Sequence, residues 1–322
     1  MSLPTGPLLQ PRTTAIKPSV QNASILVLVL IVIMFTVGTV LQALHFEAGS
    51  IITEALFFLL PALIYLKMAS PNPAAFARFK PLQLKYIPTI IMLAVSTWLV
   101  LIFFEAILLS NLMELGYEPL EEIPPPETLG QLLLYILVIA VTPGVCEEVI
   151  FRGAVLPSVE QHGMVPALLF SSLLFGMMHM SLLSFFSTFV LGLMFGLVVI
   201  KTGSIYGGML FHTLNNLIAV FSMYYSNRFE MDTQIAGSED AVALAWLAIT
   251  GLSFAAMIGG LFLLQRQSRV NPLLPSRRGF LPRGWINWAS VLIAIIFIGA
   301  VAFELLLGFG FFDFLETLPA PQ

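Results

Sequence analysis

The sequence predicts an all-α fold, a polytopic bundle of transmembrane helices, and three observations support this. The 322 residues are 58% hydrophobic and only 10% charged, whereas soluble domains carry about 45–50% apolar and about 25% charged residues. The mean hydropathy of the chain is +0.94. Long apolar runs recur along the chain, each bounded by charge, proline or glycine. We therefore expect an integral membrane protein that is surrounded by a lipid bilayer.

Nine apolar runs are each predicted to cross a bilayer core about 30 Å thick, which needs about 20 helical residues. They lie at residues 24–44, 51–66, 87–109, 129–157, 164–180, 182–200, 204–225, 241–264 and 286–307. The first run is longer than the apolar region of a usual signal peptide, so it is predicted to be an uncleaved anchor.

The distribution of charge predicts the orientation of these spans, because Lys and Arg are retained on the cytoplasmic side. Basic residues precede the first run, follow the second run and precede the last run: Arg12, Lys17, Lys67, Arg78, Lys80, Lys85, Arg266, Arg269, Arg277, Arg278 and Arg283. The loop at residues 111–130 has no Lys or Arg and carries Glu114, Glu118, Glu121, Glu122 and Glu127. We predict a cytoplasmic N-terminus and an external C-terminus.

The same composition excludes some functions. The net charge of -4 comes from 14 basic and 18 acidic residues, which are too few and too scattered for a nucleic-acid-binding surface. No nucleic-acid partner is expected, and no oligomeric state is predicted. The single cysteine, Cys146, excludes a disulfide framework and a multi-cysteine metal site; it is predicted to be a small packing residue.

Two acids and one base share barely two helical turns inside the fourth run, at Glu147, Glu148 and Arg152. An ionised residue at mid-bilayer costs about 2.5–3.5 kcal/mol, so each requires a partner or a purpose. Glu148 and Arg152 lie about 40° apart around a helix and are predicted to form a structural ion pair, whereas Glu147 and Arg152 lie about 140° apart. Glu147 must therefore meet water, a proton or a group from another helix.

Two histidines in predicted spans are the candidates for that group. His179 ends a Phe-x-x-x-His motif that begins at Phe175, and His212 begins a His-x-x-x-Asn motif that ends at Asn216. Counting about 1.5 Å of helical rise per residue from the cytoplasmic ends places Glu147, both histidines and Asn216 in one layer, roughly 14–22 Å deep. Three helices that contribute polar groups to one layer predict a site.

This set of groups allows hydrolysis. A carboxylate and an imidazole that share a water can remove its proton, while a second imidazole and a carboxamide can donate hydrogen bonds to a developing oxyanion. We assign Glu147 as the general base and His179 as the residue that co-orients the water. His212 and Asn216 are assigned as the oxyanion stabilisers, and Glu148 with Arg152 as the pair that fixes the helix.

The ordered motifs Glu-Glu-x-x-x-Arg, Phe-x-x-x-His and His-x-x-x-Asn, at residues 147–152, 175–179 and 212–216, resemble those of the CPBP intramembrane proteases. This family includes the type II CAAX prenyl endopeptidases and the bacteriocin-processing or immunity (Abi-like) proteins. The resemblance implies an all-helical core, hydrolysis of a peptide bond in a membrane-associated protein or peptide, and a catalytic first glutamate. We predict a CPBP-like catalytic core at residues 129–225, between accessory transmembrane helices at residues 1–128 and 226–322.

Family members have been described both as metalloproteases and as glutamate-dependent proteases. Glu147, His179 and His212 could supply the three ligands of a catalytic zinc, but the only remaining base would then be Glu148, which is predicted to be paired. The chain has no His-Glu-x-x-His motif. We favour activation of water without a cofactor and keep a zinc-dependent protease as the alternative.

Two rival functions remain. An ion- or proton-coupled transporter would use the same acid and histidines as a relay, but it predicts polar residues along a whole transmembrane pathway. A non-catalytic immunity or scaffold protein would keep the motifs only for packing. Acids near the external ends of spans, Glu54, Glu105 and Glu304, are expected to be solvated at the membrane interface.

Overall fold

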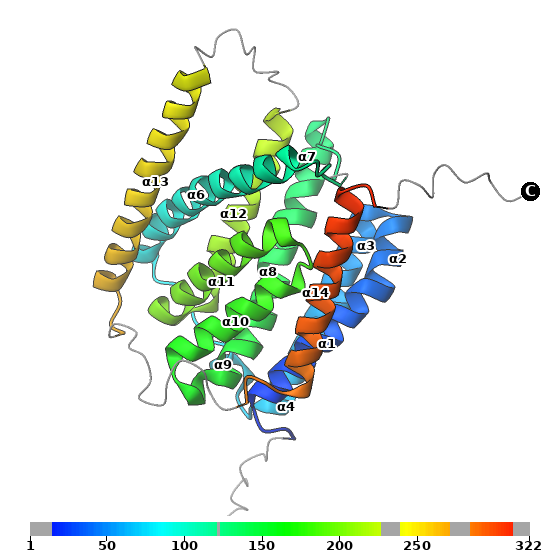
Figure 1. Cartoon of the computed structure of the whole chain (residues 1–322). Helices are drawn as coiled ribbons and strands as arrows, with labels where there is room; N and C mark the ends of the chain where they lie inside the picture. The colour runs from blue at the N-terminus through cyan, green and yellow to red at the C-terminus, as the bar shows by residue number, and fades with distance from the viewer. Residues whose placement is uncertain (1–14, 121–122, 227–238, 271–283, 312–322) are drawn as a thin grey trace, which may run out of the picture.

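The computed structural model describes residues 15–120, 123–226, 239–270 and 284–311. These residues form a bundle of helices and contain no strand (Figure 1). The all-α prediction is therefore confirmed. Some residues used in the topology prediction lie outside the described ranges: Arg12, Glu121, Glu122, Arg277, Arg278 and Arg283.

Each of the first three predicted spans is one helical stretch, and short helical segments join the second to the third. Their elements are α1 Val20–Ile33, η1 Met34–Gly38, α2 Thr39–Leu44, α3 Phe46–Ile52, η2 Thr53–Leu59, α4 Leu60–Ala69, α5 Pro73–Phe76, η3 Leu84–Tyr86 and α6 Ile87–Glu114. The segments η1 and η2 are π-helical, which means that each widens the helix locally.

The fourth predicted span is one continuous helix with two π-helical segments. It consists of α7 Leu129–Tyr135, η4 Ile136–Val141, α8 Thr142–Glu148, η5 Val149–Val155 and α9 Leu156–Val159. The two wide segments flank α8, the part that carries the paired acids. Single π-helical turns within α-helices frequently mark functional sites.

The remaining helices complete the bundle after the short segment η6 Glu160–His162. They are α10 Met164–Met178, α11 Leu182–Thr202, α12 Ile205–Ser226, α13 Glu239–Gln267 and α14 Trp288–Gly308. In Figure 1, α8, α10, α11 and α12 lie together at the centre. The helix α13 packs against α6, and α14 packs against α1.

All nine predicted runs coincide with helical segments. Within the described residues, seven helical stretches are long and apolar enough to cross a membrane: Val20–Leu44, Phe46–Ala69, Leu84–Glu114, Leu129–His162, Leu182–Thr202, Asp240–Gln267 and Trp288–Gly308. The helix α10 is shorter, with 15 residues. The helix α12 has 22 residues, but its histidine and two asparagines lower its hydropathy. The protein is thus an integral, multi-pass membrane protein.

Small residues let the central helices approach closely. A Cβ atom added at Gly192 of α11 would lie 3.0 Å from the Cα of Ser172 on α10. The hydroxyl of Ser171, also on α10, donates to the carbonyl of Phe151 in η5 at 3.0 Å. These contacts fix α10 and α11 against the helix that carries Glu147 and Glu148.

Candidate active site

The predicted ion pair is present and fully buried. Arg152 Nη1 donates to Glu148 Oε1 at 2.6 Å, and the two side chains are 1% and 0% exposed. The second terminal nitrogen, Nη2, donates to the carbonyl of Gly192 at 2.8 Å. A charged pair in a membrane interior needs further hydrogen bonds to be stable. The Gly192 carbonyl supplies one of them and so joins α11 to the pair.

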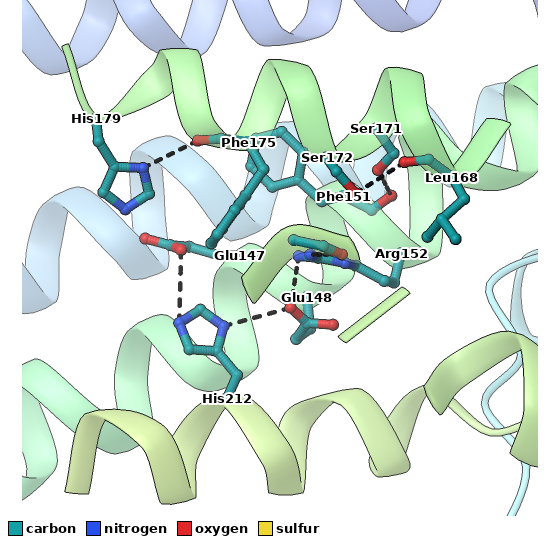
Figure 2. A network of polar contacts seen from close by, with 11 residues as sticks. Glu147, Glu148, Phe151, Arg152, Leu168, Ser171, Ser172, Phe175, His179 and His212 are labelled. Atoms are coloured by element: carbon teal, nitrogen blue, oxygen red, sulfur yellow. Dashed lines mark hydrogen bonds and ion pairs between the residues drawn. The ribbon is translucent and has the colours of Figure 1, made fainter. Parts of the chain in front are cut away.

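The Glu148 carboxylate has a second partner that the sequence did not reveal. His212 Nδ1 lies 3.3 Å from Glu148 Oε1, and Nε2 of the same ring lies 3.9 Å from Glu147 Oε2 (Figure 2). His212 is 4% exposed and thus sits between the two carboxylates. Glu148 Oε1 accepts from Arg152, and as an acceptor it requires the proton on Nδ1 of His212.

His179 is oriented by its own helix. Its Nδ1 lies 2.9 Å from the carbonyl oxygen of Phe175, four residues earlier. A carbonyl can only accept, so Nδ1 is the protonated nitrogen and a neutral ring leaves Nε2 as an acceptor. Figure 2 shows that Nε2 points towards the Glu147 carboxylate. His179 itself is exposed, unlike His212.

Glu147 lies between the two imidazoles in Figure 2 and is 8% exposed. Its Oε2 is buried and has no hydrogen-bond partner among the described residues. The 3.9 Å that separates this atom from His212 Nε2 is too long for a direct hydrogen bond. With the proton of His212 on Nδ1, both of these atoms accept, so a group that bridges them, such as a water, would have to donate to both.

The remaining predicted site residue, Asn216, bonds to the helix that carries the paired acids. Pro143 of α8 has no N–H group, so the carbonyl of Ile139 loses its usual α-helical donor. Asn216 Nδ2 donates to that carbonyl at 3.0 Å. The carboxamide therefore compensates for the proline in the neighbouring helix, and its oxygen accepts from Asn215 Nδ2 at 3.5 Å.

Aromatic rings surround the polar cluster. The guanidinium of Arg152 lies 4.6 Å from the ring centre of Phe175 and 5.2 Å from that of Phe195. Phe195 also stacks on His212, with 4.5 Å between ring centres. Phe175 meets both imidazoles edge to face, at 5.1 Å from His179 and 5.8 Å from His212. The phenylalanine of the Phe-x-x-x-His motif thus positions both histidines and the arginine.

Sequence reasoning missed Phe195, Gly192 and Gly208 as parts of the site. A Cβ atom at Gly208 would lie 2.5 Å from Glu148 Oε2 and 2.6 Å from Val199 Cγ2. The glycine therefore makes room for the carboxylate beside α12. The one available signal was the density of glycines in α11 and at the start of α12, which indicated close helix packing but no residue role.

The expectation that Glu54 is solvated at the membrane interface is wrong. Its Oε2 is buried and has no hydrogen-bond partner among the described residues. The side chain lines a cavity of about 180 Å³ together with Gln42, Ser50 and Pro143. Pro143 belongs to α8, so a third acid, from an accessory helix, lies beside the helix that carries Glu147.

The described residues contain no group of three His, Cys, Asp or Glu side chains that converges tightly enough to hold a metal ion as it stands. His179 already uses Nδ1 and His212 already uses Nδ1 for hydrogen bonds, which leaves one nitrogen of each ring for any further ligand. Cys146 is buried and free.

A family model described as Type II CAAX prenyl endopeptidase Rce1-like matches residues 129–218. The match covers under a third of the chain and includes all six predicted site residues, from Glu147 to Asn216. No curated protein and no solved structure matches the chain significantly.

Together, the helical membrane bundle and the matched domain define a class, the intramembrane proteases. Within this class, residues 129–218 match the Rce1-like type II CAAX prenyl endopeptidases, a family of hydrolases. The resemblance read from the three motifs is thereby confirmed. The helices on both sides of the matched residues lie outside what the family model describes.

Proposed function

We propose that the protein cleaves a peptide bond of a membrane-associated protein or peptide with a water that Glu147 activates. The observation that supports this most directly is the position of Glu147. Its carboxylate lies between two imidazoles from two other helices, and one oxygen has no hydrogen-bond partner among the described residues. A base must lie within reach of the proton it removes, directly or through one water.

In the proposed reaction, a water donates one proton to Glu147 and a hydrogen bond to the acceptor Nε2 of His179. The water oxygen attacks the substrate carbonyl, and the proton moves from Glu147 to Nε2 of His212, 3.9 Å away. The ring then donates from both nitrogens, to Glu148 and to the new oxyanion. The same proton passes to the leaving amine as the carbon–nitrogen bond breaks.

Glu148 and Arg152 are positioning residues in this proposal. Glu148 holds the Nδ1 side of His212, as the carboxylate of a catalytic triad holds its histidine. Arg152 keeps that carboxylate ionised and fixed. For Asn216 the contact with Ile139 supports a positioning role, because its amide would have to leave that carbonyl to serve as an oxyanion donor.

The description of the matching family points to prenylated CAAX proteins as the substrate class. We propose a prenylated CAAX peptide, in which the cysteine of the C-terminal Cys-a-a-X sequence carries the lipid, as the first probe. Protein in lipid nanodiscs is incubated with a fluorescence-quenched farnesylated peptide and with the same peptide without farnesyl. We expect cleavage of the farnesylated peptide, and Glu147→Gln should lower kcat at least about 100-fold.

The matched control is Glu114→Gln, which changes an exposed glutamate at the end of α6. We expect this variant to cleave at the wild-type rate. Undiminished cleavage by Glu147→Gln would falsify the assignment of the base. If no peptide is cleaved by the folded wild-type protein, the non-catalytic immunity or scaffold function replaces the proposal.

Water activation without a metal is part of the proposal, and a chelator tests it. A base and two imidazoles suffice for the reaction above. We expect dialysis against a zinc chelator to leave the cleavage rate unchanged. A loss of activity that added zinc restores would instead establish the zinc-dependent alternative, with Glu147, His179 and His212 as ligands.

We further propose that the N-terminus is cytoplasmic and the C-terminus external. The described basic loops meet at one end of the bundle, where Arg78 pairs with Glu160 at 2.5 Å and Lys85 Nζ donates to the carbonyl of Gln267 at 2.9 Å. Single cysteines introduced at Lys85 and Glu118, in a Cys146→Ser background, should be labelled by an impermeant thiol reagent from opposite sides of intact cells.

A further inference from the structure

The turn between α10 and α11 carries His179 and has an unusual backbone. His179 follows the last residue of α10, and α11 begins at Leu182, so only three residues reverse the chain. Met180 in this turn has φ +52°, in the left-handed region. A non-glycine residue adopts this conformation at a cost, and it persists only where the surroundings hold it.

The imidazole position depends on this turn. The His179 amide donates to Gly176 rather than to Phe175, at 3.3 Å, because the helix tightens at its end. The carbonyl of Phe175 is therefore free to accept from the imidazole Nδ1 at 2.9 Å. A change in where α10 ends would move the carbonyl that orients the ring.

Beyond the turn, the start of α11 is held from another helix. Glu304 of α14 accepts two hydrogen bonds, one per carboxylate oxygen: from Ser181 Oγ at 2.7 Å and from the Leu182 amide at 2.6 Å. The first amides of a helix have no partner within it, and in a membrane protein they must be satisfied by protein groups. The expectation that Glu304 is merely solvated at the membrane interface is therefore wrong.

The end of α14 that carries Glu304 is itself fixed. The amide of Glu118, in the loop after α6, donates to the carbonyl of Gly308 at 2.7 Å. Tyr117 packs directly against Gly308, where an added Cβ would overlap its ring, and it meets Phe309 edge to face at 5.5 Å. A carboxylate on an anchored helix end can hold a turn in place, whereas one on a frayed end cannot.

We propose that Glu304 is a positioning residue for catalysis: it clamps Ser181 and Leu182 and so fixes the turn that sets the orientation of His179. This inference rests on the proposed function of His179. It gives the C-terminal helix α14, which lies outside the residues of the family match, a part in the reaction. A shift of a catalytic group by about 1 Å can cost up to about 100-fold in rate.

The test compares Glu304→Ala and Glu304→Gln with the wild-type protein in nanodiscs. The variants are assayed for kcat and KM with the farnesylated peptide, and for hydrogen exchange of residues 176–184 by mass spectrometry. For Glu304→Ala we expect kcat to fall about 10- to 100-fold with KM changed less than about twofold. Exchange at the Leu182 amide should accelerate, because its acceptor is gone.

Glu304→Gln keeps one carbonyl acceptor, so the fall in kcat and the acceleration of exchange should both be smaller than in Glu304→Ala. The matched control is Asn287→Ala, which removes the cap at the other end of the same helix, where Asn287 Oδ1 accepts from the amides of Ala289 and Ser290 at 3.1 Å. This control should lower the melting temperature without changing kcat or the exchange of the turn. An equal loss of kcat in the control would mean that α14 acts only through general stability.

The failure of this inference is distinguishable from failure of the proposed function. If Glu304→Ala leaves both kcat and the exchange of residues 176–184 unchanged, the clamp is overturned even though Glu147 is catalytic. If the wild-type protein cleaves nothing, the exchange measurement and the ¹⁵N chemical shifts of the His179 ring still test the clamp. Unchanged shifts and exchange in Glu304→Ala would then overturn the clamp on structural grounds alone.

Discussion

Two arginines, one in the matched core at residues 129–218 and one in a helix outside it, make different kinds of contact. In the core, Glu148 bonds to both Arg152 and His212, and Arg152 reaches a third helix through Gly192. In the accessory helix α13, Arg266 is exposed and lies over the ring of Phe262 of its own helix. A polar group that links helices specifies their relative position, whereas one that contacts its own helix does not.

The largest expected contrast comes from one substitution made in both regions. Arg152→Met leaves Glu148 charged, buried and without its cation, which should cost about 3–5 kcal/mol of folding free energy. Arg266→Met removes an exposed charge and should stay within about 0.5 kcal/mol. Thermal and denaturant unfolding in detergent measure both. Similar losses for the two variants would show that the core pair is no more structural than a surface arginine.

A second contrast uses glycine. Gly208→Ala would put a methyl group against Glu148 Oε2 and Val199, so we expect about 1–3 kcal/mol of destabilisation from overpacking. Gly251→Ala in α13 meets nothing within 4 Å and should stabilise its helix by about 0.5–1 kcal/mol. Unfolding midpoints that move in the same direction for both variants would contradict the close approach of α12 to Glu148.

The smallest contrast involves two asparagines. Asn216→Ala leaves the Ile139 carbonyl without its side-chain donor, at a cost of about 1–2 kcal/mol. Asn111→Ala, in the exposed last turn of α6, removes only a bond to the carbonyl of Ile107 on its own helix and should cost less than about 0.5 kcal/mol. Equal unfolding midpoints for the two variants would mean that the helix around Pro143 needs no support from α12.

These differences also explain what the sequence could and could not predict. The Glu148–Arg152 pair was predictable because its partners are one helical turn apart and helix geometry alone brings them together. The apolar runs predicted the helices for a similar reason, since bilayer thickness sets their length. Both predictions depend on local geometry.

The other contacts join residues far apart in sequence. His212 meets Glu148 across 64 residues, and Glu304 meets Leu182 across 122. Hydropathy predicts how deep such a residue lies in the membrane, but it does not predict which neighbouring helix the residue faces. For this reason Glu54 and Glu304 were predicted as interfacial acids, although both lie against the groups of the core. Asn216 was given a role by its spacing from His212, and its contact depends on a proline in another helix.

The two imidazoles differ in accessibility: His179 is exposed, and His212 is buried against Phe175 and Phe195. A molecule that approaches the site from outside the bundle therefore meets His179 before His212. An inhibitor could therefore combine an apolar group with a single hydrogen-bond donor for Nε2 of His179. Such an inhibitor would not need to displace His212.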